Sequence, residues 1–175
     1  MALWRRVERE CERLVDALEI PEGIRDLRDL CDLVGDRLGQ GIELEDMPTR
    51  PLRYRGLPLC GLTLVGADGR TTIYVERSTT WRHRLVIGTH ELGHLALGHE
   101  PSSCEEVLGL DTTDRAFTRS HFSRPAERAA EVFGALLTER AMTPAPGLPG
   151  ASAPTQLSRV EQSLLPTRRR RRVWR

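Results

Sequence analysis

The sequence predicts an α+β domain followed by a linker and a basic tail. Apolar residues recur at helical spacing in four separate segments, and short segments between them alternate with the two-residue period of strands. The chain has 175 residues, of which 39% are hydrophobic and 29% charged, which suits one globular domain with a sizeable core. We expect that domain to span residues 1–142, with a Pro-, Gly- and Ala-rich linker over 143–155 and a largely disordered Arg-rich tail over 156–175.

Two amphipathic helices are predicted at the start of the chain. Apolar residues repeat at helical spacing over residues 3–18, and Pro21 ends this first helix. The pattern repeats over residues 24–38, where Gly39 supplies the C-terminal stop of the second helix.

Three strands are predicted to follow these helices. Residues 41–45 alternate between apolar and polar side chains, and residues 57–65 and 71–76 have the composition of two paired strands. Between them lies Ala67-Asp68-Gly69, a hairpin turn signal in which Gly69 permits a positive φ. We therefore expect a short three-stranded sheet that contains an antiparallel pair. Residues 101–123 show no clear period and are predicted to form a loop.

Two further helices are predicted, one on each side of that loop. The first contains the apolar run over residues 85–97, with N-cap candidates at residues 78–80 and a closing glycine at Gly98. The second covers residues 125–142 and begins with Pro125, a residue suited to a first helical turn.

The most informative motif is His90-Glu91-Leu92-Gly93-His94, which lies within the first of these helices. Residues four apart share one helix face, so His90 and His94 can both bind one Zn²⁺. Glu91 lies beside them, where it can take a proton from a water at that ion. The motif therefore predicts a zinc site with two histidine ligands and Glu91 as the general base.

A catalytic zinc usually takes three protein ligands, so another residue must complete the site. Glu127 and Glu131 are four apart on the following helix, which lets one bind the metal while the other hydrogen-bonds a histidine ligand. Surface charge pairs are the alternative interpretation, because Arg124 and Arg128 flank the two glutamates. We favour Glu127 as the ligand, given the two histidines upstream.

Two other histidines are weaker candidates. His99 misses the H-E-x-x-H-x-x-G-x-x-H spacing by one residue, so a partly exposed polar residue at the helix end is the favoured interpretation. His121 could act as a ligand or stabilise an oxyanion, but a loop histidine is the simpler interpretation.

Two segments about thirty residues apart carry a family resemblance. Residues 89–99 read THELGHLALGH and residues 127–137 read ERAAEVFGALL. Together they resemble the ImmA/IrrE family of zinc metallopeptidases, whose second motif runs Glu, any, Glu/Gln, Ala, Asn/Asp, any, Phe, Ala and then Leu-Leu. Aligned on Phe133, the resemblance implies Glu127 as the glutamate ligand, whereas Glu131 takes the Asn/Asp position and is an alternative ligand. Ala129 and Gly134 depart from the pattern.

The resemblance covers roughly residues 20–140 and implies a zincin-like fold. It further implies an intracellular bacterial zinc endopeptidase that cleaves or inactivates a helix-turn-helix transcriptional repressor, from a mobile element or a stress regulon. We expect peptide hydrolysis with Zn²⁺ as cofactor. We also expect residues 71–76 to form an edge strand, beside which the substrate adds in an extended conformation.

One alternative belongs to another functional class: a non-catalytic regulator in which zinc stabilises the fold and which binds a repressor or DNA. A third interpretation is a toxin-like component of a two-gene module that uses the same chemistry on another target. The tail carries seven Arg and one Glu over residues 155–175, so the remainder of the chain is acidic although the whole has a net charge of +1. Weak, nonspecific nucleic-acid contact is one interpretation of the tail and a solvated charge run is the other. The residues concerned are Arg168, Arg169, Arg170, Arg171 and Arg172.

The sequence also predicts a cytoplasmic location and no membrane partner. No run approaches the roughly 18 apolar residues of a membrane span, and the first residues lead into a charged helix. The cysteines are widely spaced and form no C-x-x-C pair, which predicts reduced thiols; they are Cys11, Cys31, Cys60 and Cys104.

Overall fold

The computed structural model describes residues 2–21, 24, 26–48, 53–54, 57–104, 108, 113–117 and 123–142. The chain divides into one compact unit over residues 1–143 and a second segment over 144–175. The predicted linker and tail, including Arg168–Arg172, therefore lie outside the described residues, as does His121.

The first unit is an α+β domain. Its helices, within the described residues, are α1 (Ala2–Asp16), α2 (Leu27–Leu38), α3 (Trp81–Ala96) and α5 (Arg124–Met142). Its strands are β1 (Ile42–Asp46), β2 (Arg53–Tyr54), β3 (Leu57–Pro58), β4 (Gly61–Val65), β5 (Thr71–Val75), β6 (Ser102–Ser103) and β7 (Arg115–Phe117).

The helix boundaries follow from capping residues. The second helix begins at Leu27, later than the predicted residue 24, because the Asp26 carboxylate caps it by accepting from the backbone N–H groups of Arg28 and Asp29. Gly39 ends the same helix with a φ of 69°, as predicted. Thr80 caps α3 by accepting from the backbone N–H of His83.

The main sheet has five strands in the order β1-β5-β4-β7-β6, whereas three were predicted. β1 pairs with β5 in parallel, and the other neighbours are antiparallel, so the sheet is mixed. The two extra strands, β6 and β7, lie within residues 101–123, so the prediction of a loop was wrong for residues 102–103 and 115–117. Strands of two and three residues are too short to show a two-residue period, and β7 is defined by its pairing with β4.

The predicted hairpin is confirmed in part. β4 and β5 pair antiparallel, and Gly69 in the turn has a φ of 83°. The predicted strand over residues 57–65 is broken, however, because β3 pairs with β2 in a separate two-stranded sheet.

The expectation that a substrate adds beside residues 71–76 is wrong. β5 lies between β1 and β4 in the sheet, so its backbone groups already pair on both sides. An extended peptide can add only to a strand with an unpaired edge.

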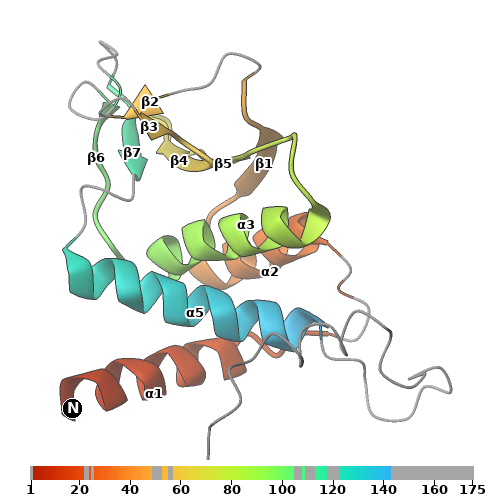
Figure 1. The fold of residues 1–175 in the computed structure, drawn as a ribbon, viewed down its shortest axis with the longest axis vertical. Coiled ribbons are helices and arrows are strands. Elements are labelled where there is room, and N and C mark those ends of the chain that lie inside the picture. Colours follow the sequence, from red (N-terminus) through yellow and green to blue (C-terminus); the bar gives the residue numbers. More distant parts are fainter. Residues whose placement is uncertain are drawn as a thin grey trace, which may run out of the picture. The chain divides into compact units, whose positions relative to one another are not determined.

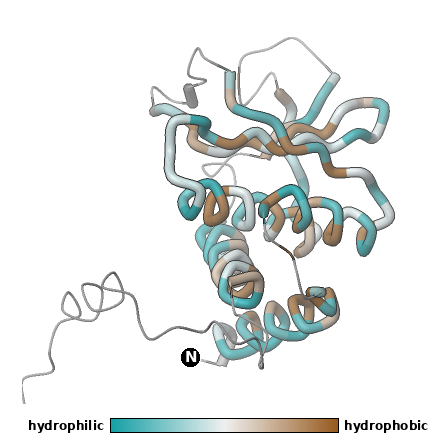
Figure 2. The backbone as a smooth tube through the Cα atoms, turned by 90° about the vertical axis from the view of Figure 1, so that its right-hand side faces the viewer, coloured by the Kyte–Doolittle hydropathy of each residue, from teal (hydrophilic) through white to brown (hydrophobic). Residues whose placement is uncertain are grey.

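Figure 1 shows the sheet on one side of the domain, with α2 and α3 beneath it, α5 beneath α3, and α1 beneath α5. Along the helices in Figure 2, hydrophobic residues alternate with hydrophilic ones, as expected for elements buried on one face. The main core lies between the sheet and these helices; its fully buried members include Cys11, Leu30, Cys31, Ile73, Val75, Leu92 and Leu137.

The two central helices, α3 and α5, approach each other closely at two glycines. A Cβ on Gly93 would lie 2.9 Å from the carbonyl oxygen of Ala130, and a Cβ on Gly134 would lie 3.0 Å from backbone atoms of Thr89 and His90. Further along, the hydroxyls of Thr89 and Thr138 are 2.9 Å apart. Residue numbers rise on α5 as they fall on α3, so the two helices run antiparallel with their backbones nearly in contact.

We expect Gly93→Ala to lower the free energy of unfolding by about 1–3 kcal/mol, because the added methyl would force the two helix backbones apart. By helix propensity alone, alanine should stabilise the helix by roughly 1 kcal/mol relative to glycine. A net loss of stability would therefore show that the clash between the added methyl and α5 outweighs that gain. Urea denaturation followed by circular dichroism measures it.

Gly41→Ala is the matched control, because nothing lies within 4 Å of a Cβ at Gly41. That variant should unfold at or above the wild-type urea concentration. Equal stability of Gly93→Ala and wild type would contradict the close approach of α3 and α5.

Candidate metal centre

Two of the candidate ligands lie on one face of α3, one helical turn apart. The Nε2 atoms of His90 and His94 are 3.2 Å apart, and the two rings meet edge to face with centroids 4.8 Å apart. The His94 side chain is 2% exposed and the His90 side chain 14% exposed, so both rings are held within the protein.

The third member of the group comes from the first turn of α5. Ser123 precedes this helix, and its carbonyl oxygen accepts from the backbone N–H of Glu127. The two carboxylate oxygens of Glu127 lie 3.6 Å from the Nε2 atoms of His90 and His94, respectively. The close approach of α3 and α5 therefore brings together three side chains from two helices.

These distances fit a tetrahedral metal site. Ligand atoms placed 2.0–2.1 Å from one ion at tetrahedral angles are separated from each other by about 3.3–3.4 Å. The two Nε2 atoms, 3.2 Å apart, match that value, and each Nε2 lies 3.6 Å from a different oxygen of Glu127, so the carboxylate is close enough to share an ion with both rings. In the described part of the chain, His90, His94 and Glu127 are the group of potential ligand side chains that converges within 4.8 Å.

The alternative ligand, Glu131, lies elsewhere on α5. Its side chain is exposed, and it does not belong to the converging group. Glu127 lies one turn earlier, in the first turn of the helix, and its carboxylate is the one that reaches both histidines.

Glu91 points from α3 towards the sheet. The Thr63 hydroxyl on β4 donates to Oε2 of Glu91 over 2.8 Å, and both residues are buried. Two residues earlier on the same face of β4, a Cβ on Gly61 would come within 2.9 Å of Oε1 of Glu91. β4 thus binds one carboxylate oxygen with a hydroxyl and approaches the other closely at a residue without a side chain. Sequence reasoning missed both residues, because neither belongs to a motif.

His99 is not a member of the converging group, but it contacts one of that group. Its Nδ1 lies 2.9 Å from Nδ1 of His94, on the side of that ring opposite the shared Nε2 cluster. The residue is half-buried, and burial lowers the pKa of its imidazole. Sequence reasoning had weighed His99 only as a metal ligand or as a polar residue at the helix end.

The cysteines supply no ligand to this site. All four are free thiols, as predicted, and three are buried. Burial raises the pKa of Cys31 to about 12, and burial raises the pKa of the Cys11 and Cys104 thiols as well. These thiols therefore stay protonated at neutral pH, whereas metal ligation requires the thiolate.

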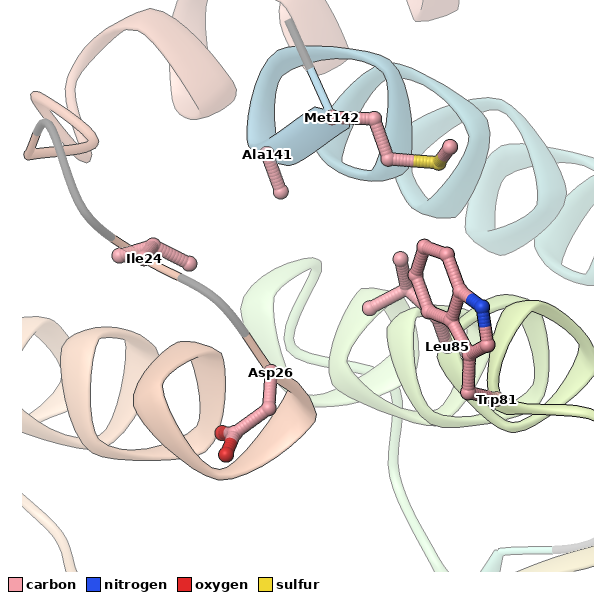
Figure 3. A pocket seen from close by; sticks show the side chains of 6 residues that line it. All are labelled: Ile24, Asp26, Trp81, Leu85, Ala141 and Met142. Carbon is pink, nitrogen blue, oxygen red and sulfur yellow. The ribbon is translucent and has the colours of Figure 1, made fainter. Parts of the chain in front are cut away.

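A separate pocket of about 130 Å³ lies at the other end of α3 (Figure 3). It is lined by Ile24, Asp26, Trp81, Leu85, Ala141 and Met142. Its only acidic side chain is the N-cap of α2, and thirteen residues separate Trp81 from His94, which is about 20 Å along a helix. Its lining offers no chemistry to the metal-binding group.

Comparisons with protein-family models, curated proteins and solved structures gave no significant match. Among the described residues, no helix combines the length and apolarity needed to cross a membrane.

We expect Glu127→Gln to weaken Zn²⁺ binding by more than the roughly 10–100-fold that is typical of changes to an outer partner of a ligand. The amide lacks the charge of the carboxylate and is a poor zinc ligand. Competition with a chromophoric chelator measures the affinity. Glu131→Gln is the matched control on the same helix and should bind as wild type; the reverse order would make Glu131 the ligand.

We expect Thr63→Val to lower the free energy of unfolding by about 1–3 kcal/mol, because it removes the donor to Glu91 at nearly constant volume. Thr71→Val is the control: the Thr71 hydroxyl is equally buried and has no hydrogen-bond partner in the described part of the chain. Urea denaturation should show Thr71→Val to be neutral or stabilising. Equal effects of the two variants would contradict a specific role for the Thr63 hydroxyl.

Proposed function

We propose that this protein is a zinc-dependent endopeptidase that cleaves or inactivates a helix-turn-helix transcriptional repressor. The observation that carries the proposal is the convergence of His90, His94 and Glu127 beside a separately held acid, Glu91. The resemblance of residues 89–99 and 127–137 to the ImmA/IrrE family supports the choice of reaction and substrate.

The donor set favours zinc over other divalent ions. Two imidazoles and one carboxylate are a common zinc ligand set in hydrolases, whereas Ca²⁺ and Mg²⁺ prefer oxygen ligands throughout. When bound, a zinc ion supplies Lewis-acid activation of water and of the scissile carbonyl. The ligands would be Nε2 of His90, Nε2 of His94 and the Glu127 carboxylate.

The protein's own contribution to proton transfer lies with Glu91. Because Thr63 donates to Oε2, we assign Oε1 as the atom that takes the proton from the attacking water and returns it to the leaving amine. Gly61 lets β4 approach this carboxylate closely, since a Cβ there would lie 2.9 Å from Oε1. The hydroxyl of Thr63 orients the carboxylate throughout.

The substrate strand must add to an edge of the sheet. Among the described strands, β1 and β6 are at the edges of the five-stranded sheet. We assign the peptide to the β6 side, because β7, which pairs with β6, places Phe117 against the His94 ring with centroids 6.0 Å apart. β-addition there would bring the peptide near the metal ligands. A cytoplasmic location belongs to the same proposal.

The non-catalytic regulator stays as an alternative that one experiment separates from the peptidase, and the toxin-like component stays as one that would use the same chemistry on another target. Both the regulator and the peptidase need the metal-binding residues, but only the peptidase needs Glu91 as a base. The DNA-contact interpretation of the tail stays a prediction, since that segment lies outside the described residues.

We expect Glu91→Gln to lower the rate of repressor cleavage by at least about 10²–10⁴-fold, because the amide cannot accept the proton. Zinc affinity should be unchanged, since Glu91 is not a ligand. The assay incubates zinc-loaded protein with purified helix-turn-helix proteins of the source genome, those encoded beside this gene first, and detects new termini by mass spectrometry.

Glu100→Gln is the matched control, because Glu100 is exposed and outside the converging group. It should cleave at the wild-type rate. If no repressor is cut by fully zinc-loaded protein, while Glu91→Gln relieves repression in cells as well as wild type does, the non-catalytic regulator is the correct function.

A further inference from the structure

His99 owes its position to the way α3 ends. Gly98 has a φ of 66°, and its backbone N–H donates to the carbonyl oxygen of Leu95 over 3.0 Å. The backbone N–H of His99 donates to the carbonyl oxygen of His94 over 3.0 Å. These two bonds are the paired bonds of a Schellman motif, which turns the chain back over the last helical turn. The motif therefore fixes residue 99 directly against residue 94.

The two imidazoles meet through their Nδ1 atoms, 2.9 Å apart, with ring centroids 5.0 Å apart. In a hydrogen bond between neutral rings, one Nδ1 carries the proton and the other accepts it. If His99 were the donor, His94 would carry its own proton on Nε2, the atom that faces His90 and Glu127. If His94 is the donor, its Nε2 presents a lone pair to that group. Only the second arrangement permits His94 to bind a metal.

We propose that His99 is a positioning residue for the metal centre: it accepts the Nδ1 proton of His94 and thereby holds that ring in the metal-binding tautomer and orientation. The inference rests on the proposed metal site. A ligating histidine commonly donates its second N–H to a carboxylate or a carbonyl. Here the acceptor is a second imidazole, that of His99, which the turn at the end of α3 places five residues after His94.

This role fits the position of the His99 ring, which is half-buried and lies at the end of the helix that carries His94. His94 is almost fully buried, with a 2% exposed side chain, so few solvent molecules can reach its Nδ1 to fix the tautomer. His99 reaches it from the end of the same helix, through a turn whose two hydrogen bonds lie within residues 94–99. The residue that orients His94 and the residue that completes the ligand set thus come from different helices.

The test compares Zn²⁺ affinity in three full-length variants by competition with a chromophoric chelator. His99→Phe keeps the ring but removes the acceptor, and we expect binding to weaken about 10–100-fold. His99→Asn places an amide oxygen where Nδ1 lies and should restore binding towards the wild-type value. His83→Phe is the matched control, because His83 is an exposed histidine near the start of the same helix.

A second measurement does not depend on any variant. Long-range ¹H–¹⁵N correlation spectra of the zinc-loaded wild type should show His94 protonated at Nδ1 and His99 protonated at Nε2. The opposite pairing, or equal zinc affinity of His99→Phe and wild type, would overturn the positioning role. If the wild type itself fails to bind Zn²⁺, the proposed metal centre fails instead, so the two failures are distinguishable.

Discussion

The near contact between the backbones of α3 and α5 is the constraint on which the candidate site depends. Gly93 and Gly134 have no side chains, and any Cβ there would press against the backbone of the opposite helix. This close, antiparallel approach lets a glutamate in the first turn of α5 reach two histidines on α3. A wider separation would leave Glu127 with neither histidine as a neighbour, whatever the sequence of the motif.

α3 also serves two neighbours at once. Adjacent residues on a helix point about 100° apart, so His90 faces Glu127 on α5 while Glu91 faces Thr63 on β4. The metal-binding residues and the acid are thereby held by different elements. This division lets the proposed base keep a fixed position without occupying a place among the ligands, and the helix end adds His99 as a third, local support for His94.

Much of the fold was predictable because its signals are local. Helical periodicity, Gly39 and Thr80 as caps, and Gly69 in the hairpin act through neighbouring residues, and each prediction is confirmed. β6 and β7 were missed because two or three residues carry no period of their own; pairing with distant strands defines them. The assignment of residues 71–76 to an edge failed for the same reason, since strand order is not a local property.

The sequence by itself determined that His90 and His94 share a face, because four-residue spacing on a helix is set by backbone geometry. It also singled out Glu127, as an acid on the next apolar helix, to complete the ligand set. Only the tertiary structure decided which distant side chains contact these residues: Thr63 reaches Glu91 across 28 positions, and Glu127 reaches His90 across 37. Such contacts depend on how helices and strands pack, and packing is specified by the whole core rather than by any one segment.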